Sequence, residues 1–265
     1  MNIEQKNIIL QIKNLSVGYV SKKQTNTIVS NIDLSVPKGK LVALLGKNGA
    51  GKSTLLRTLS KVQQPISGDI FIENASIKNY TQPELAKILS VVLTERLPES
   101  QLSVFEIVAL GRQPYTNWLD RLSINDMKKI QTALDLTDIT HLKNKPFHQL
   151  SDGQLQRVLI ARALAQDTEI IILDEPTAHL DIHHTYKVFS LLKTLVKNTN
   201  KTILISTHEV NLAMQLADEF ILLTKERVFN GNATSLIEQN AFSQLFPKEN
   251  ISFNKELQQF VINKN

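Results

Sequence analysis

The stretch Gly46–Ser53, which reads GKNGAGKS, decides the fold. It matches the pattern G-x-x-x-x-G-K-[S/T] and lies between the apolar run Leu41–Leu45 and the helical pattern Ser53–Lys61. Glycines let the backbone turn several N–H groups inward, and the start of a helix adds a partial positive charge, so such a loop can hold a di- or triphosphate. We expect contacts with the phosphates from the whole loop: Gly46, Lys47, Asn48, Gly49, Ala50, Gly51, Lys52 and Ser53.

Three side chains of this motif have defined roles. Lys52 is expected to reach the β- and γ-phosphates, and the hydroxyl of Ser53 is expected to ligate Mg²⁺. Thr54 can add a contact with the α-phosphate. The alternative is a plain glycine-rich turn, which the order of strand, loop and helix disfavours.

The regions on either side of this loop predict an α/β core. Short continuous apolar runs are typical of parallel strands that are covered on both faces, and they occur at Leu41–Leu45, Ile170–Leu173, Thr202–Ser206 and Phe220–Leu223. Helical patterns lie between these runs, at Ser53–Lys61, Gln154–Leu164, Thr185–Val196 and Val210–Leu216. In contrast, Ile8–Val17 and Ile28–Val36 alternate apolar and polar residues, which predicts antiparallel strands with one exposed face.

The chain has 265 residues, a length that fits either one large domain or a core with a subdomain. Arg96–Ala161 lacks a convincing strand pattern, carries Pro98 and Pro114, and includes a helical stretch at Asn125–Leu134. After Gly231 we expect a helix through Phe246 and then a short strand pair. The predicted division is a core of residues 1–95 and 162–232, a helical subdomain at about 96–161, and a C-terminal extension at about 233–265.

Composition excludes several classes of protein. Hydrophobic residues make up 42% of the chain and charged residues 21%, as in soluble globular proteins. No apolar run approaches the roughly 18 residues of a membrane helix, and Met1–Leu10 lacks the pattern of a signal peptide, so we expect a cytoplasmic protein. The absence of cysteine excludes disulfide scaffolds and thiol chemistry. The net charge of +5 permits an anionic partner, but the basic residues lack the interleaved aromatics of a single-strand nucleic-acid binder.

Two carboxylates follow a predicted buried strand, in the stretch Ile170–Glu175. Ligands of α/β proteins bind at the carboxyl ends of the strands, so Asp174 can anchor Mg²⁺ and Glu175 can polarise the water that attacks a γ-phosphate. His208 follows the strand Thr202–Ser206 and is expected at the same edge. Read alone, His208 could also be a histidine that caps the next helix.

These motifs, together with Leu150–Gln154 (LSDGQ), closely resemble those of the ATP-binding cassette ATPases. The resemblance spans about Ile9 to Gly231. It implies an α/β fold of the P-loop NTPase class: an ABC ATPase cassette with a RecA-like core, an N-terminal antiparallel β subdomain and a helical subdomain. It also implies ATP and Mg²⁺ as cofactors, with Glu175 as general base and with Lys52 and His208 stabilising the γ-phosphate.

The resemblance also implies a head-to-tail homodimer, in which the signature LSDGQ of one subunit closes over the ATP held by the other. Ser151 is a suitable helix N-cap, Gly153 allows close approach to the γ-phosphate, and Gln154 begins the helix. Two further positions match the family: Ala178–Asp181 is similar to the D-loop, and Tyr19 lies where an aromatic residue stacks on adenine.

Two positions depart from the family pattern. Asp152 replaces the first glycine of the signature and brings a negative charge toward a phosphate, which is unfavourable unless its side chain points outward. The strand Ile88–Glu95 ends where the family has a glutamine, and the aligned residue here is Glu95. We carry Glu95 over as a further Mg²⁺ ligand.

The stretch Gly111–Tyr115 (GRQPY), with Trp118 after it, resembles the importers of iron–siderophore complexes, haem and cobalamin. An arginine with two aromatics on a loop suits a protein interface, and it also suits a small satellite core. The resemblance implies an ATPase subunit at the cytoplasmic face of the membrane, bound to two membrane-spanning permease subunits, with a substrate-binding protein in the complex. Iron–siderophore is the first expectation for the cargo.

Three other interpretations stay open. A soluble cassette ATPase of translation, DNA repair or cluster assembly commonly carries paired cassettes, whereas this chain has one glycine loop and one signature. A P-loop kinase or GTPase would lack the signature and D-loop. His179, His183 and His184 beside Asp181 could suggest a metal site, although the D-loop match accounts for His179.

Overall fold

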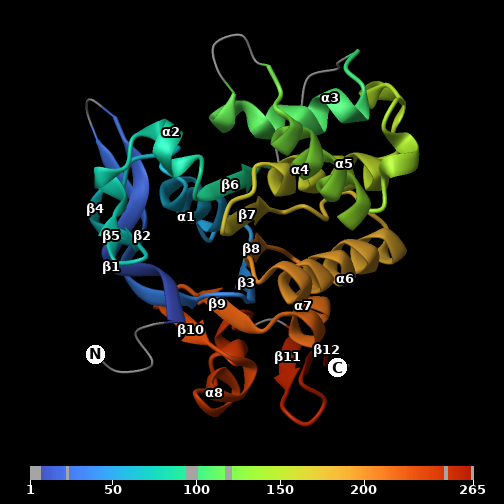
Figure 1. Cartoon of the computed structure of the whole chain (residues 1–265). Coiled ribbons are helices and arrows are strands. Elements are labelled where there is room, and N and C mark those ends of the chain that lie inside the picture. The colour runs from blue at the N-terminus through green and yellow to red at the C-terminus, as the bar shows by residue number, and fades with distance from the viewer. Residues whose placement is uncertain (1–6, 22–23, 94–100, 117–120, 248–249, 264–265) are drawn as a thin grey trace. The chain divides into compact units, whose positions relative to one another are not determined.

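The computed structural model describes residues 7–21, 24–93, 101–116, 121–247 and 250–263. The chain forms two compact units, of which unit 1 comprises Met1–Asn79 and Thr202–Asn265 and unit 2 comprises Tyr80–Lys201 (Figure 1). Each unit is described by itself below. The division into core, helical subdomain and C-terminal extension drawn from the sequence stays a prediction.

Unit 1 contains an antiparallel sheet in the strand order β2-β1-β4-β5. Leu10 and Ile12 of β1 pair with Val36 and Leu34 of β2. The side chains of β1 that alternate inward, such as Leu10 and Ile12, are almost fully buried, so the predicted pair of antiparallel strands is confirmed. The bounds are β1 Ile8–Val20, β2 Thr25–Pro37, β4 Ser67–Ile72 and β5 Ala75–Ser76.

The second sheet of unit 1 is parallel around β3 (Leu41–Gly46), the strand that leads into the glycine loop. Ala43 of β3 pairs with Ile205 of β8 (Thr202–Ser206) on one side and with Phe220 of β9 (Glu219–Leu223) on the other. Every residue of β3 and β8 is buried, as the continuous apolar runs predict. The short strand β10 (Val228–Gly231) pairs antiparallel with β9.

The remaining elements of unit 1 are short. Figure 1 shows the last part of the chain, α8 and the hairpin β11–β12, beside α7 and the β9–β10 strands. The predicted helix at Ser53–Lys61 is found two residues shorter at its C-terminal end, and the predicted strand pair of the tail is present. The bounds are α1 Lys52–Leu59, η2 Ile77–Asn79, α7 Val210–Leu216, α8 Ala233–Glu238, η6 Phe242–Gln244, β11 Ile251–Asn254 and β12 Gln259–Ile262.

Unit 2 combines a parallel strand pair with helices. Val91 of β6 (Leu89–Val92) pairs with Ile172 of β7 (Ile170–Asp174). Between β6 and α5 the described residues form helices and no strand apart from an isolated bridge, Ser103 to Pro146. The bounds are α2 Gln82–Leu85, α3 Val104–Ala109, η3 Leu110–Tyr115, α4 Ile124–Leu136, η4 Thr140–Leu142, η5 Phe147–Gln149, α5 Asp152–Ala165 and α6 Ile182–Thr199.

Four helices of unit 2 begin with the same device. A serine or threonine accepts a hydrogen bond from the backbone of the third helical residue, whose side chain accepts one in return. These capping boxes pair Thr81 with Glu84, Ser103 with Glu106, Ser123 with Asp126, and Ser151 with Gln154. The polar residues that open each helix therefore fix where it starts.

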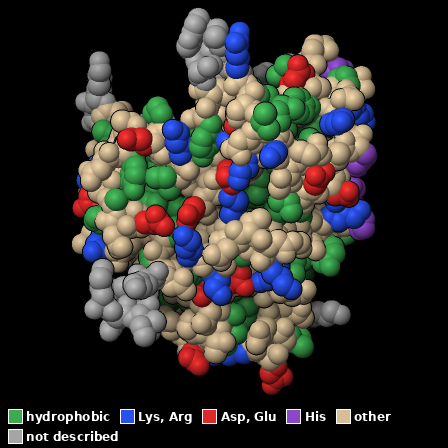
Figure 2. All heavy atoms as spheres, viewed as in Figure 1, with side chains coloured by type: hydrophobic (Ala, Val, Ile, Leu, Met, Phe, Trp, Pro, Cys, Tyr) green, Lys and Arg blue, Asp and Glu red, His purple; other side chains and the backbone are tan. Residues whose placement is uncertain are grey.

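The surface carries charges of both signs. Figure 2 shows Lys and Arg side chains interspersed with Asp and Glu on the face that it presents. Among the described residues, no helix has the length and apolar character needed to cross a bilayer.

Candidate nucleotide-binding site

The glycine loop of unit 1 connects β3 to α1 through backbone conformations that glycine favours. Gly49 and Gly51 have φ values of +75° and +98°, and Gly51 is the N-cap of α1. A Cβ atom at Gly51 would lie 2.8 Å from Cγ2 of Val29, so a larger residue there would be both strained and crowded. The loop therefore runs directly into the N-terminal end of the eight-residue helix α1. Backbone N–H groups at a helix N-terminus can bind an anion.

Two predicted phosphate-binding residues meet at this loop. Lys52 is buried, and its Nζ donates hydrogen bonds to the carbonyl oxygens of Gly46 at 3.0 Å and Lys47 at 3.4 Å. The same Nζ lies 3.4 Å from Nε2 of His208. His208 lies between the end of β8 and the start of α7. Because β8 pairs in parallel with β3, its carboxyl end lies at the same edge of the sheet as the glycine loop that follows β3. The structure thus brings together Lys52 and His208, which are 156 residues apart in the sequence.

Tyr19 lies beside the same helix. Its hydroxyl is 3.4 Å from Oγ1 of Thr54, while the residue as a whole is 52% exposed. An aromatic ring that is anchored at its hydroxyl and exposed over the first turn of α1 is available for stacking against a planar ligand. Stacking on adenine, the role that the resemblance implies for Tyr19, stays a prediction.

A hollow of about 330 Å³ opens in front of the loop. Gly46, Lys47, Asn48 and His208 line it, together with Val210 and Phe246. Nζ of Lys47 lies 5.9 Å from the centre of the Phe246 ring, which is a cation–π distance. Phe246 was not among the predicted residues, because no local pattern shows that the C-terminal part of the chain returns to the glycine loop.

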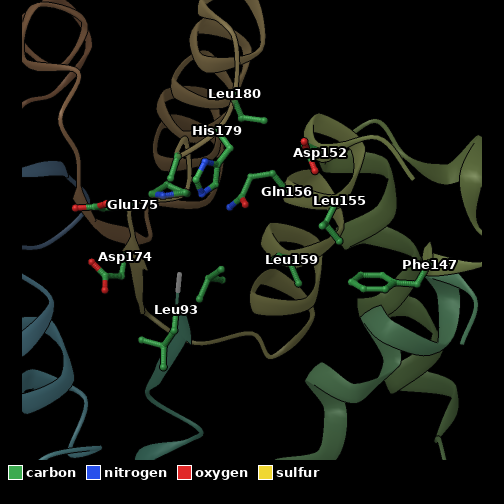
Figure 3. A pocket seen from close by; sticks show the side chains of 13 residues that line it. Leu93, Phe147, Asp152, Leu155, Gln156, Leu159, Asp174, Glu175, His179 and Leu180 are labelled. Carbon is green, nitrogen blue, oxygen red and sulfur yellow. The ribbon is translucent and has the colours of Figure 1, made fainter. Parts of the chain in front are cut away.

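In unit 2, Asp174 and Glu175 stand at the carboxyl end of β7. Asp174 is almost fully buried. Glu175 has a φ of +47°, which is uncommon outside glycine and is a feature that strained functional positions often show. Figure 3 shows the two carboxylates close to each other at the strand end, with His179 and Leu180 following in the chain.

Residues 178–181, which resemble the D-loop, end at Asp181, the N-cap of α6. Asp181 caps α6 by accepting a hydrogen bond from the backbone N–H of His184 at 2.8 Å, and its carboxylate also lies 2.9 Å from Nδ1 of His184. The backbone hydrogen bond from His184 lowers the pKa of Asp181, and the imidazole contact adds to it. His183 contacts the His184 ring edge-on at 5.7 Å. The described residues hold no group of three or more potential metal ligands.

The signature residues form the start of α5. Ser151 Oγ accepts a hydrogen bond from the backbone N–H of Gln154 at 3.4 Å, and Gln154 Oε1 accepts one from the backbone of Ser151 at 3.2 Å. A Cβ atom at Gly153 would lie 2.6 Å from Cδ2 of His184, so the glycine is needed where α5 approaches α6. Asp152 is exposed in the first turn of α5, where a negative charge is favoured by the helix dipole.

The stretch Gly111–Tyr115 shows an arginine that is part of the interior. Arg112 is 2% exposed; its Nε donates to Asp126 at 2.8 Å and its Nη1 donates to the carbonyl of Ala165 at 2.6 Å. The guanidinium also lies 4.0 Å from the centre of the Tyr115 ring. Burial raises the pKa of Tyr115. The stretch was interpreted either as a protein interface or as a small satellite core, and the burial of Arg112 agrees with the satellite core.

Several sequence-based expectations fall outside what the structure describes. Glu95, Pro98 and Trp118 lie outside the described residues. Of the other candidates, unit 1 brings together Tyr19, the glycine loop and His208, and unit 2 holds Asp174, Glu175 and the signature residues. The roles of these residues stay predictions.

Comparison with known proteins gives consistent matches. Residues 29–178 match the family described as ABC transporter. A petrobactin import ATP-binding protein of Bacillus anthracis is 34% identical over 241 residues, which cover 91% of this chain and 87% of that protein. A metal-chelate type ABC transporter, solved in an inward-facing conformation, matches with a TM-score of 0.77 and 31% identity over 96% of each chain.

A dimeric ATP-binding cassette bound to ADP and Pi is also similar. It matches with a TM-score of 0.72 and 29% identity, covering 84% of this chain and 98% of that one. These likenesses confirm the predicted fold, an α/β ABC cassette with an antiparallel β part and a helical part.

Proposed function

We propose that this chain, which belongs to the ABC transporter family and is therefore an ATP-hydrolysing cassette, energises the import of an iron–siderophore complex. The observation that carries the proposal is the meeting of Lys52 and His208 at the glycine loop, 3.4 Å apart. It supports a site in which a cationic side chain and an imidazole contact the same terminal phosphate. Petrobactin, named for the relative in Bacillus anthracis, supports a siderophore as the cargo class.

ATP is held in this proposal by residues of the loop and its helix. The loop backbone and Lys52 bind the β- and γ-phosphates, Thr54 adds a contact with the α-phosphate, and Tyr19 stacks on adenine. Mg²⁺ prefers oxygen ligands, which Ser53 and Asp174 offer as a hydroxyl and a carboxylate, and Glu95 is proposed as a third. When bound, Mg²⁺ neutralises charge on the phosphates.

Hydrolysis then uses groups of the chain itself. Glu175 accepts a proton from the attacking water, whose oxygen forms a bond to the γ-phosphorus while the bond to the β–γ bridging oxygen breaks. His208 and Lys52 donate hydrogen bonds to the γ-phosphate oxygens. ADP and inorganic phosphate leave, so the step balances without any further reactant.

The proposed assembly is a homodimer on two membrane-spanning permease subunits at the cytoplasmic face of the membrane, with a substrate-binding protein on the other side. In the dimer, Ser151, Gly153 and Gln154 of one subunit complete the ATP site of its partner. No nucleic-acid partner is proposed. Haem or cobalamin uptake, and a soluble cassette ATPase, are the alternatives that the test below separates.

The test combines hydrolysis with uptake. Glu175→Gln removes the proton acceptor but keeps the shape of the side chain, so we expect turnover of the full chain to fall by about 10²- to 10⁴-fold with ATP binding retained. Lys52→Ala is the matched control and is expected to lose ATP binding as well. In cells that depend on this chain, Glu175→Gln should abolish uptake of ⁵⁵Fe-labelled siderophore.

Three outcomes would count against parts of this proposal. A Glu175→Gln protein that hydrolyses ATP at the parental rate contradicts the role of Glu175. Loss of haem or cobalamin uptake, with siderophore uptake intact, reassigns the cargo. Intact uptake of all three in cells that carry the variant favours the soluble cassette.

A further inference from the structure

The C-terminal hairpin holds the helix that follows His208. Asn211, in the first turn of α7, makes two hydrogen bonds with one residue of β12. Its Nδ2 donates to the carbonyl oxygen of Phe260 at 3.1 Å, and the backbone N–H of Phe260 donates to its Oδ1 at 2.7 Å. Because an amide that both donates and accepts must match two partners at once, this pair fixes the direction of the Asn211 side chain as well as its distance.

The hairpin is in turn anchored to the frame of the parallel sheet. Phe253 of β11 stacks on Phe242, with ring centroids 4.8 Å apart, and Phe260 of β12 lies 5.2 Å from Phe253. Phe242 contacts Phe220 of β9 edge-on at 5.6 Å. Since Phe220 pairs with Ala43 of β3, the aromatic cluster ties the hairpin to the strand that delivers the glycine loop.

The same segment also reaches the loop directly. The ring of Phe246 lies 5.2 Å from that of Phe260 and 5.9 Å from Nζ of Lys47. It shares the lining of the hollow with His208. The C-terminal segment thus contacts the loop on one side and α7 on the other.

We propose that Asn211 is a positioning residue for the reaction, acting through its clamp on Phe260 to hold the imidazole of His208 opposite Lys52. The inference rests on the proposed function and deepens it. If the clamp is lost, the first turn of α7 can shift, and His208 less often contacts the γ-phosphate in the transition state. The loop still binds ATP, so the loss falls on kcat and not on KM.

The experiment uses the full chain and a control within the same hairpin. Asn211→Ala should lower kcat for ATP hydrolysis by about tenfold or more, with the affinity for a fluorescent ATP analogue changed less than about twofold. Asn263→Ala removes a hydrogen bond between Ser252 and Asn263, 2.8 Å long, which does not involve α7. It should leave both quantities within about twofold of the parent.

A second readout follows the histidine itself. The ring signal of His208 in ¹H–¹³C NMR spectra, assigned with His208→Ala, should shift in Asn211→Ala and stay in place in Asn263→Ala. Asn211→Asp keeps the acceptor for Phe260 N–H but sets its second carboxylate oxygen against the carbonyl oxygen of Phe260, so its kcat should also fall below that of the parent.

An unchanged kcat in Asn211→Ala, or a lowered kcat with an unmoved His208 signal, overturns the inference. If Asn211→Ala does not fold by circular dichroism, Asn211→Asp supplies both readouts. Failure of the parent chain to hydrolyse ATP would refute the proposed function, whereas the response of the His208 signal would still decide the positioning role.

Discussion

At the scale of single residues, the buried ion pair of unit 2 gives the sharpest prediction. Arg112 and Asp126 are 2% and 4% exposed. Hydrogen bonds from Ser123 hold the pKa of Asp126 below its ordinary value, and the hydrogen bond and charge of Arg112 lower this pKa further. Asp126→Asn leaves the guanidinium without a counter-charge. We expect it to lower the free energy of unfolding at pH 7 by about 3 kcal/mol, measured by urea denaturation.

The same substitution predicts a pH dependence. A carboxylate whose pKa is lower in the folded state stabilises the protein above its unfolded pKa, near 3.9 for aspartate, and loses this contribution as the pH falls through the folded value. The difference in stability between the parent and Asp126→Asn should therefore shrink below about pH 4. Glu106→Gln changes the equivalent residue of an exposed capping box, so its loss at pH 7 should be the smaller of the two. Equal losses would contradict the role of the buried pair.

Residues with local signals were predictable, and residues with distant partners were not. The spacing of the glycine loop pointed to Lys52 and Ser53, and the strand end pointed to Asp174 and Glu175; these residues lie at the start of α1 and at the end of β7 as expected, and their roles stay predictions. The sequence favoured a protein interface over a small satellite core for the stretch that holds Arg112, because the partners of Arg112 lie 14 and 53 residues along the chain. No local pattern announces such contacts.

At the scale of elements, the start of α5 carries two tasks that can be separated. Ser151 caps the helix and is also proposed to contact the ATP of the partner subunit. Ser151→Ala should lose about 1 kcal/mol of stability, whereas Ser151→Asp keeps a capping oxygen and should stay within about 0.5 kcal/mol of the parent. The added charge of Ser151→Asp should nevertheless suppress ATP-dependent dimerisation, as followed by light scattering.

The cap of α3 provides the control for the two substitutions of Ser151. Ser103 makes the same kind of capping box with Glu106. Ser103→Ala and Ser103→Asp should repeat the stability changes and leave dimerisation unaffected. If Ser151→Asp dimerises as the parent does, Ser151 has no role beyond the cap.

Strands that are buried along their whole length were predicted well, and several partly exposed strands were missed. The continuous runs gave β3, β7, β8 and β9 nearly at their true bounds, because burial on both faces demands apolar residues throughout. The strands β4, β5 and β10 were not predicted. Ile70 and Ile72 of β4 and Phe229 of β10 are buried, but these strands span only two to six residues, too few for an alternation to stand out, so only their pairing partners reveal them.

At the scale of the whole molecule, the proposed residues fall in both units. Lys52 and His208 belong to unit 1, and Glu175 and the signature belong to unit 2. Asp152 is the residue of this chain that departs from the signature, and it is exposed at the start of α5.

The last prediction concerns that departure. In a Glu175→Gln background with ATP, the chain should dimerise, and Asp152→Asn should lower the dimer dissociation constant by about tenfold. A unit charge about 10 Å from a Mg²⁺-bound triphosphate with about two net negative charges costs roughly 0.8 kcal/mol in water, and the head-to-tail homodimer contains this pair twice. Salt screens this repulsion, so the gain should shrink as ionic strength rises from 0.01 M to 0.15 M, measured by analytical ultracentrifugation. Asp138→Asn removes another exposed carboxylate of unit 2, outside the signature, and should leave dimerisation unchanged. A dissociation constant that ignores Asp152→Asn at low salt would mean that the side chain points away from the bound nucleotide and that its only electrostatic partner is the dipole of α5.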